Sequence, residues 1–165
     1  VYDRPSVDDR VTDLLWMVRV SPVCSPEVAE QIQGQSLVEA LKTSELLHVK
    51  LESEPRGLLW GMFVRQFGLE VDTDRGLAFD TAISAVQYAM SGGGVALADI
   101  DMFAQEIADG RLVRPFEAMM EDGYGYYLKF HAEDLGDPAI SLFRSWVLGR
   151  FAAATGRAVS EMLDI

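Results

Sequence analysis

The clearest hydrophobic pattern in the chain predicts an amphipathic helix near its middle. Asp80 and Thr81 are residue types that favour the position before a helix, because their side-chain oxygens accept hydrogen bonds from its free N–H groups. Ile83, Val86 and Met90 follow at helical spacing, so they fall on one face. The pattern indicates a helix that is capped by Asp80 or Thr81 and buries one side.

A glycine run and a short apolar stretch come directly after this helix. Gly92–Gly94 end it, since a left-handed residue is needed there and a Cβ is costly. Val95–Ala98 is apolar throughout, which is typical of a parallel strand covered on both faces. A helix that starts at the carboxyl end of a strand presents free N–H groups, and open α/β sheets bind small ligands there.

The rest of the chain alternates between strand and helix patterns. Further strands are predicted at residues 14–20, 46–51, 77–80, 112–116 and 124–131, with residues 1–5 as a strand end. Further helices are predicted at residues 26–33, 36–42, 57–67, 101–108 and 139–154, with a loose helical turn in 155–165. An acidic turn at residues 121–123 joins the last two strands, and strands that alternate with helices predict an α/β sandwich.

The longest helix, residues 139–154, carries Ile140, Phe143, Val147 and Phe151 on one stripe. Without further elements to cover it, this helix and the preceding strand would expose apolar surface. Such a surface favours association between copies.

Composition narrows the class of protein. A chain of 165 residues with 49% hydrophobic content is long enough for one domain or two small lobes. It shows no apolar run that could span a bilayer and no signal-peptide pattern at residues 1–4. The net charge of −12 repels phosphates, which makes these residues poor candidates for direct contact with nucleic acid.

The sequence offers little for enzyme or metal chemistry. His48 and His131 lie in different predicted strands, and Cys24, the only cysteine, pairs with neither and is expected to be a small buried residue. A single cysteine cannot form an internal disulfide, which favours a reducing compartment. No Cys/His spacing indicates zinc. We therefore predict no catalytic residue, no metal and no cofactor.

Two further stretches could suggest ligand binding but favour structural roles. Asp99-Ile100-Asp101 lacks the other carboxylates and the glycine of a calcium loop, so a strand-to-helix cap is expected. The glycine run lacks the Lys-Ser/Thr ending of a phosphate-binding loop, and carbonyls at a helix C-terminus repel phosphate.

The order and spacing of several segments resemble the effector-binding domain of LysR-type transcriptional regulators. The matching segments are residues 18–26, 79–81, 92–97, 102–103, 109–116, 125–128 and 139–146. The resemblance is greatest to the branch that contains the glycine-cleavage activator and the β-lactamase regulator AmpR, and it extends to about Ala152.

The resemblance implies an α/β, periplasmic-binding-protein-like fold (type 2) with two lobes. Residues 16–113 would form one complete lobe. Residues 1–15 and 114–152 would form part of the other, and 153–165 a tail. The family's remaining first-lobe elements would precede Val1, so an N-terminal truncation is expected.

The implied function is effector sensing. A small molecule binds between the lobes, and the change passes through a dimer or tetramer to DNA-bound N-terminal winged helix-turn-helix domains, which this sequence lacks. A cytoplasmic location without membrane contact is expected. Two alternatives stay open: a periplasmic solute-binding protein of a transport system, and an enzyme built on the same fold.

Site residues follow from the same resemblance. Thr81, with Asp80, matches the family position whose hydroxyl residues line the effector pocket, although plain helix capping explains the same pair. Tyr126 matches a tyrosine that reaches the pocket from the other lobe, although it could be an ordinary strand aromatic. Tyr2 and Pro22 are expected near the rim and hinge. The acids that follow Val95–Ala98 disfavour an anionic effector.

Overall fold

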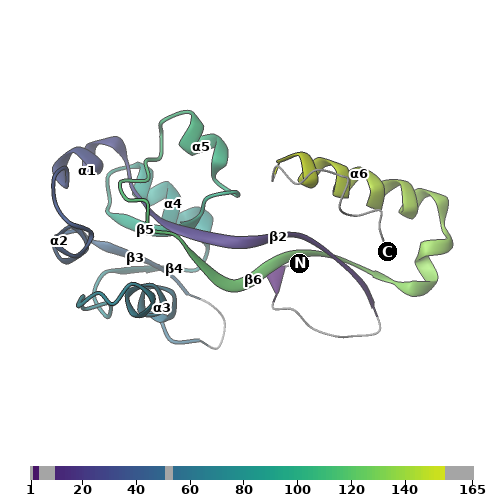
Figure 1. The fold of residues 1–165 in the computed structure, drawn as a ribbon, viewed down its shortest axis with the longest axis horizontal. Helices are drawn as coiled ribbons and strands as arrows, with labels where there is room; N and C mark the ends of the chain where they lie inside the picture. Colours follow the sequence, from purple (N-terminus) through teal and green to yellow (C-terminus); the bar gives the residue numbers. More distant parts are fainter. Residues whose placement is uncertain (1, 4–9, 51–53, 155–165) are drawn as a thin grey trace. The chain divides into compact units, whose positions relative to one another are not determined.

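The computed structural model describes residues 2–3, 10–50 and 54–154, with side chains within 11–50 and 54–151. The described chain forms two compact units (Figure 1). The central unit consists of residues 19–122, and the terminal unit combines the residues before 19 with those after 122. Two long strands, β2 (Arg10–Val23) and β6 (Met120–His131), have residues in both units.

The central unit is a sheet with helices on both faces. Its strands beyond β2 are β3 (Leu46–Val49), β4 (Leu77–Phe79) and β5 (Val95–Asp99). Its helices are α1 (Pro26–Gln31), α2 (Leu37–Thr43), α3 (Leu58–Gln66), α4 (Ala82–Met90) and α5 (Ala104–Ala108). The strand order is β2-β5-β3-β4; β3 runs parallel to both its neighbours and β2 antiparallel to β5.

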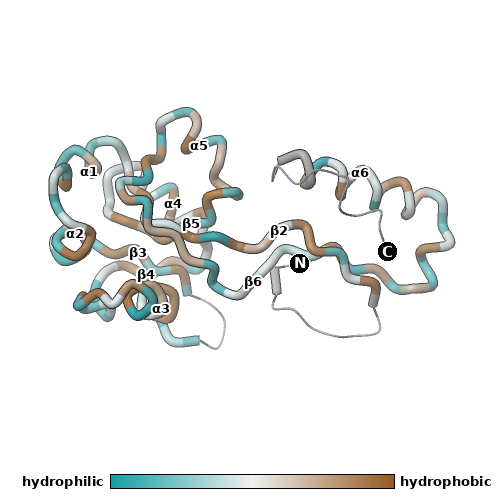
Figure 2. The backbone as a smooth tube through the Cα atoms, viewed as in Figure 1, coloured by the Kyte–Doolittle hydropathy of each residue, from teal (hydrophilic) through white to brown (hydrophobic). Residues whose placement is uncertain are grey.

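The two faces of this sheet are covered by different helices, because α3 and α4 lie on opposite sides of the strands (Figure 1). On the α4 side, Val86 and Ala89 pack with Leu47, Ala96 and Phe103. On α3, the Trp60 and Phe63 rings meet edge to face with centroids 5.7 Å apart. Burial of every residue in β5 follows from this double cover, and the central strands are largely hydrophobic (Figure 2).

The glycine run ends α4 as predicted. The N–H groups of Gly92 and Gly93 donate to Ala89 O and Tyr88 O, each at 3.0 Å, and Gly92 has a φ of +86°. Gly94, at φ +144°, brings its backbone so close to β3 that an added Cβ would lie 2.3 Å from Glu45 O. The connection from helix to strand therefore depends on two glycines for two different reasons.

The terminal unit contains a three-stranded arrangement with the order β1-β6-β2, where β1 is Tyr2–Asp3. A 3-10 helix, Ala132–Gly136, leads from β6 into α6 (Pro138–Ala154). Trp16 stacks on Tyr126 and on Phe151, with ring centroids at 4.2 and 5.0 Å. Arg144 donates two hydrogen bonds of 2.6 Å to Asp13, which ties α6 to β2.

Two predictions about the segment before residue 124 are wrong. Residues 112–116 form no strand: only Val113 bridges to Cys24, and Pro115 cannot donate to a ladder. The predicted acidic turn at Glu121, Asp122 and Gly123 lies inside β6. Burial alternates from Met120 to Gly123, which is the period of a strand, and Gly123 tolerates its φ of +84°.

The other elements agree with the prediction to within a few residues. The predicted strand at 14–20 extends to Arg10–Val23, and the helix predicted from residue 101 begins at Ala104, after a turn. Leu51 and residues 155–165, for which a strand end and a helical turn are predicted, lie outside the described residues. Within the described part, no helix is both long and apolar enough to cross a membrane.

Cys24 and His48 have the structural roles that the sequence indicates. Cys24 is fully buried, and burial raises the pKa of its thiol to about 11. His48 is buried in β3, where its Nε2 lies 2.7 Å from Arg75 O. His131 is exposed at the end of β6.

Candidate functional site

The carboxyl ends of the parallel strands meet at one edge of the central unit. Lys50 follows β3, Asp80 follows β4, and Asp99 ends β5. Lys50 N–H donates to Phe79 O at 2.8 Å, which holds the first two strand ends together. We call this edge, with Arg19, Lys50, Asp80, Thr81, Asp99 and Asp101, the carboxyl edge. Open α/β sheets bind ligands at such an edge.

Thr81 begins α4 at the carboxyl edge. Its backbone is extended (φ −138°, ψ 149°), and its Oγ1 accepts a hydrogen bond from Ser84 N at 3.1 Å. The hydroxyl also lies 2.8 Å from Ser84 Oγ. Both Asp80 and Thr81 are exposed. The predicted capping role of Thr81 is confirmed, and its contact with a ligand stays a prediction.

Exposure of this helix start matters because the first N–H groups of a helix have no partner within it and carry partial positive charge. Lys50, also exposed, adds a cation from the neighbouring strand end. Asp80 and the Thr81 hydroxyl supply acceptors. The carboxyl edge thus offers hydrogen-bond donors and acceptors to a small polar molecule.

An ion pair that sequence reasoning missed lies at the end of β5. Arg19 donates to both carboxylate oxygens of Asp101 over 2.7–3.0 Å, and this hydrogen bonding raises the pKa of the guanidinium. Asp101 N–H in turn donates to Asp99 Oδ1 at 3.0 Å. This hydrogen bond lies in the turn between β5 and α5, but the predicted strand-to-helix cap is wrong, because the residue before α5 is Phe103 and no side chain caps that helix. The pairing joins residues 82 positions apart. The only signal of it in the sequence is the charged residue Arg19 within an otherwise largely apolar predicted strand.

The other predicted site residues lie elsewhere. Tyr126 is half-buried in the terminal unit against Trp16, and the backbone of Tyr2 pairs with it across β1 and β6. Pro22 lies in β2 opposite Leu97, where its side chain is fully buried. That burial favours a packing role for Pro22. The described structure brings Asp80 together with Thr81, and Tyr2 with Tyr126. Ligand binding by any of the five stays a prediction.

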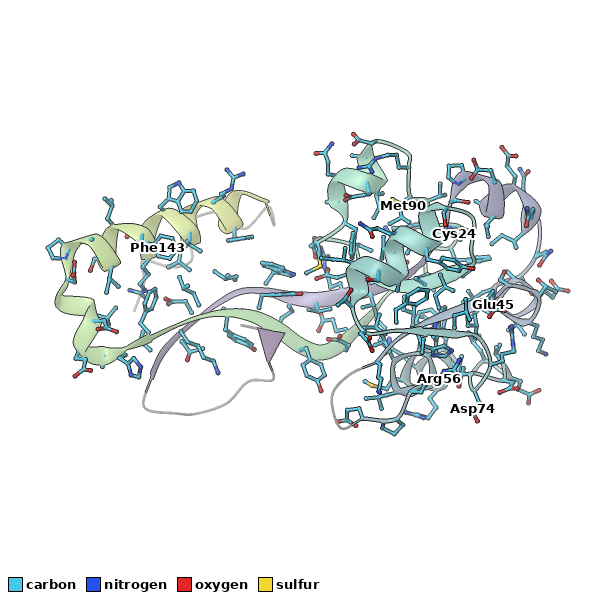
Figure 3. The ribbon with its side chains drawn as sticks, turned by 180° about the vertical axis from the view of Figure 1, so that it is seen from behind. Cys24, Glu45, Arg56, Asp74, Met90 and Phe143 are labelled. Atoms are coloured by element: carbon cyan, nitrogen blue, oxygen red, sulfur yellow. The ribbon has the colours of Figure 1, made fainter. Side chains whose placement is uncertain are left out.

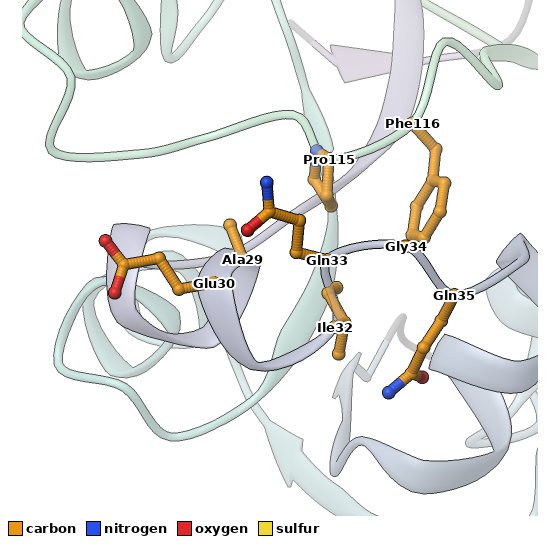
Figure 4. Close-up of a pocket in the computed structure, with 8 residues that line it drawn as sticks. All are labelled: Ala29, Glu30, Ile32, Gln33, Gly34, Gln35, Pro115 and Phe116. Atoms are coloured by element: carbon orange, nitrogen blue, oxygen red, sulfur yellow. The ribbon is translucent and has the colours of Figure 1, made fainter.

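A cavity of about 470 Å³ lies in another part of the central unit (Figure 4). It separates the turn between α1 and α2 from the segment that contains Pro115 and Phe116. Its lining consists of Ala29, Glu30, Ile32, Gln33, Gly34, Gln35, Pro115 and Phe116. It includes none of the predicted site residues, and Glu30 is the one charged residue in the lining. The only sequence signal is the amide-rich stretch at residues 31–35.

The described residues include no group of three or more His, Cys, Asp or Glu side chains that could hold a metal ion.

Comparison with known proteins connects this architecture to a family. Residues 1–152 match the model of the LysR substrate binding domain. The chain belongs to the LysR substrate-binding-domain family. This LysR domain is 33% identical over 153 residues to the glycine cleavage system transcriptional activator of Escherichia coli K12, covering 92% of this chain and 48% of that protein.

A second relative is the HTH-type transcriptional activator AmpR of Rhodobacter capsulatus. It is 32% identical over 133 residues, which cover 81% of this chain and 43% of the relative. The chain thus spans about half the length of the curated relatives it matches. Both relatives are transcriptional regulators rather than enzymes.

Solved structures agree on the fold. The effector domain of AmpR from Pseudomonas aeruginosa matches with a TM-score of 0.75 and 27% identity, over 94% of this chain and 73% of that one. The regulatory domain of CrgA from Neisseria meningitidis, at 17% identity, matches the fold with a TM-score of 0.70 over 91% of this chain and 74% of that one. The predicted family and the α/β, periplasmic-binding-protein-like fold class are confirmed. The assignment of residues 16–113 to one lobe stays a prediction. The structure shows a central unit of residues 19–122.

Proposed function

We propose that this chain is the effector-sensing part of a LysR-type transcriptional regulator and that its effector binds at the carboxyl edge. The observation that carries the proposal is the match of residues 1–152 to the LysR substrate binding domain. Within that domain, an exposed helix start at Thr81 lies at the carboxyl ends of parallel strands. The relatives are regulators, which favours this function over solute transport.

The proposed mechanism is a shift between conformations. An effector changes the balance between two states only through its different affinity for each. The net charge of −12 supports a domain that senses the effector and leaves DNA contact to a separate winged helix-turn-helix segment. A cytoplasmic location and a dimeric or tetrameric assembly belong to the same proposal.

Thr81→Val is expected to weaken effector binding about fivefold, the value of one lost hydrogen bond of about 1 kcal/mol. Loss of the cap is expected to cost about 1–2 kcal/mol of folding stability. The measurement is a thermal-shift screen of polar metabolites against the wild-type chain. Titration of each ligand found with both proteins, at a temperature where both are folded, then gives the two affinities.

Thr43→Val is the matched control. Thr43 is exposed at the end of α2, and its hydroxyl lies 3.1 Å from Glu39 O and 3.3 Å from Gln35 Oε1. The same change there is expected to leave ligand affinity unaltered. If every ligand binds wild-type and Thr81→Val equally well, Thr81 is a helix cap and the proposed site is wrong.

A further inference from the structure

The cavity beside α1 has the size and the mixed walls of a small-molecule site. Its volume of about 470 Å³ falls in the usual range of ligand pockets, which combine apolar walls with a few polar groups. Pro115 and Phe116, both half-buried, form one wall. Glu30 and Gln33, both exposed, lie on the α1 side of the cavity (Figure 4). The cavity therefore brings an aromatic ring, an amide and a carboxylate to one place.

The wall that contains Phe116 is held to β2. Val113 exchanges two backbone hydrogen bonds with Cys24: Cys24 N–H donates to Val113 O at 3.0 Å, and Val113 N–H donates to Cys24 O at 2.8 Å. Cys24 is labelled in Figure 3, inside the central unit. The Nε–H of Arg114 donates to Ser21 Oγ at 3.3 Å. These bonds fix the chain directly before this wall.

The opposite wall is fixed by bonds within the turn between α1 and α2. Ser36 and Glu39 cap α2 reciprocally: Ser36 N–H donates to Glu39 Oε2 at 2.9 Å, and Glu39 N–H donates to Ser36 Oγ at 3.3 Å. The Thr43 hydroxyl donates to Gln35 Oε1 at 3.3 Å. Gly34 supplies the left-handed residue of the turn, with a φ of +79°. Both walls are thus held by the fold itself.

Two polar groups of the lining are available to a ligand. Within the described residues, neither the Glu30 carboxylate nor the Gln33 side-chain amide forms a hydrogen bond or an ion pair. Arg114, a cation of the opposite segment, is engaged by Ser21 at 3.3 Å and by Glu117 at 3.9 Å. Glu30 is therefore a carboxylate without a cation from the described part of the chain, and the net charge of −12 attracts cations further.

We propose that the cavity beside α1 is a second ligand site and that it binds a small organic amine in its protonated form. The ammonium group donates to the Glu30 carboxylate and to the side-chain carbonyl of Gln33. The apolar part of the ligand packs on Pro115 and Phe116, and the face of the Phe116 ring attracts the positive charge. The inference is independent of the proposed effector site, because the lining includes no residue of the carboxyl edge.

Three matched probes test the charge requirement. Phenethylamine, 2-phenylethanol and phenylacetate share a ring and carry a positive charge, no charge and a negative charge at neutral pH. Amide chemical-shift titration of the ¹⁵N-labelled chain is expected to place the shifts caused by phenethylamine on residues 29–35 and Phe116. A dissociation constant on the order of 1 mM is expected for so small a ligand.

The uncharged alcohol is expected to bind about threefold more weakly, which is the value of one exposed ion pair. Phenylacetate is expected not to shift the amides of the lining, because Glu30 repels its carboxylate. Equal binding of all three probes, or phenethylamine shifts that fall outside the lining, overturns the proposal.

Glu30→Gln removes the charge and keeps the shape of the side chain. It is expected to weaken phenethylamine binding about threefold and to leave the binding of 2-phenylethanol unchanged. Glu70→Gln is the matched control, because Glu70 is exposed in the central unit and lies outside the cavity lining. It is expected to leave the binding of both probes unchanged. An equal effect of the two variants would show attraction to the net charge instead of a site, and overturns the proposal.

Phe116→Leu tests the aromatic wall. Loss of the attraction between the ring and the ammonium group is expected to weaken phenethylamine binding about threefold. Phe143→Leu, at a position 52% exposed on α6, is expected to leave it unchanged. Wild-type affinity of Phe116→Leu would contradict the placement of the amine against this ring.

Discussion

Gly94→Ala is expected to lower the free energy of unfolding by about 3–5 kcal/mol, among the largest effects of a single substitution. An added Cβ would lie 2.3 Å from Glu45 O, the atom that accepts the hydrogen bond of Val95 N at 2.9 Å. Relief of this clash has to separate the start of β5 from the residue before β3. Urea denaturation followed by circular dichroism measures the loss.

Gly92→Ala separates the clash from the cost of the backbone conformation. Gly92 also has a positive φ, +86°, but the nearest atom to its added Cβ is Ser25 Oγ at 3.9 Å. The expected loss there is about 1 kcal/mol, from the left-handed conformation alone. Equal losses for the two variants would contradict the role assigned to the close approach of Gly94 and Glu45.

Trp60→Ala is expected to lower the free energy of unfolding by a similar amount, about 3–5 kcal/mol. Trp60 is 1% exposed, packs edge to face on Phe63, and donates its Nε1–H to Leu47 O at 3.0 Å. The substitution leaves a cavity beside α3 and removes one hydrogen bond to a carbonyl of β3. Denaturant unfolding of the variant, monitored by circular dichroism, gives the value.

Trp60→Phe serves as the graded comparison. It keeps one aromatic ring but removes the indole N–H and the volume of the second ring, so a loss of about 1–3 kcal/mol is expected from the lost hydrogen bond and a smaller cavity. A loss below about 1 kcal/mol for Trp60→Ala would contradict the view that α3 supplies one of the two covers of the central sheet.

Local signals predicted the helix and strand that build the carboxyl edge. The cap at Thr81 depends on Ser84, three residues away, and the glycine run forms its hydrogen bonds with Tyr88 and Ala89 in the preceding helix. The unbroken apolar run from Val95 indicates by itself a strand that is covered on both faces. Each of these features arises from neighbours in the sequence, and a single sequence displays such neighbours directly.

Features that depend on distant partners were missed. The Arg19–Asp101 pair joins residues 82 positions apart. The acidic stretch at residues 121–123 resembles a turn until its alternating burial in β6 is known, and Val113 makes only a single bridge to Cys24. The two roles considered for Thr81 look the same in the sequence, because the same hydroxyl is suited both to capping a helix and to contacting a ligand.

The most direct test of the carboxyl-edge proposal is amide chemical-shift mapping of the ¹⁵N-labelled chain during titration with a ligand from the thermal-shift screen. We predict that the largest shifts fall on residues 80–84 and on Lys50, at the start of α4 and the end of β3. Shifts confined to residues 29–35 and 115–116 would instead locate the ligand in the cavity beside α1 and contradict the proposed site.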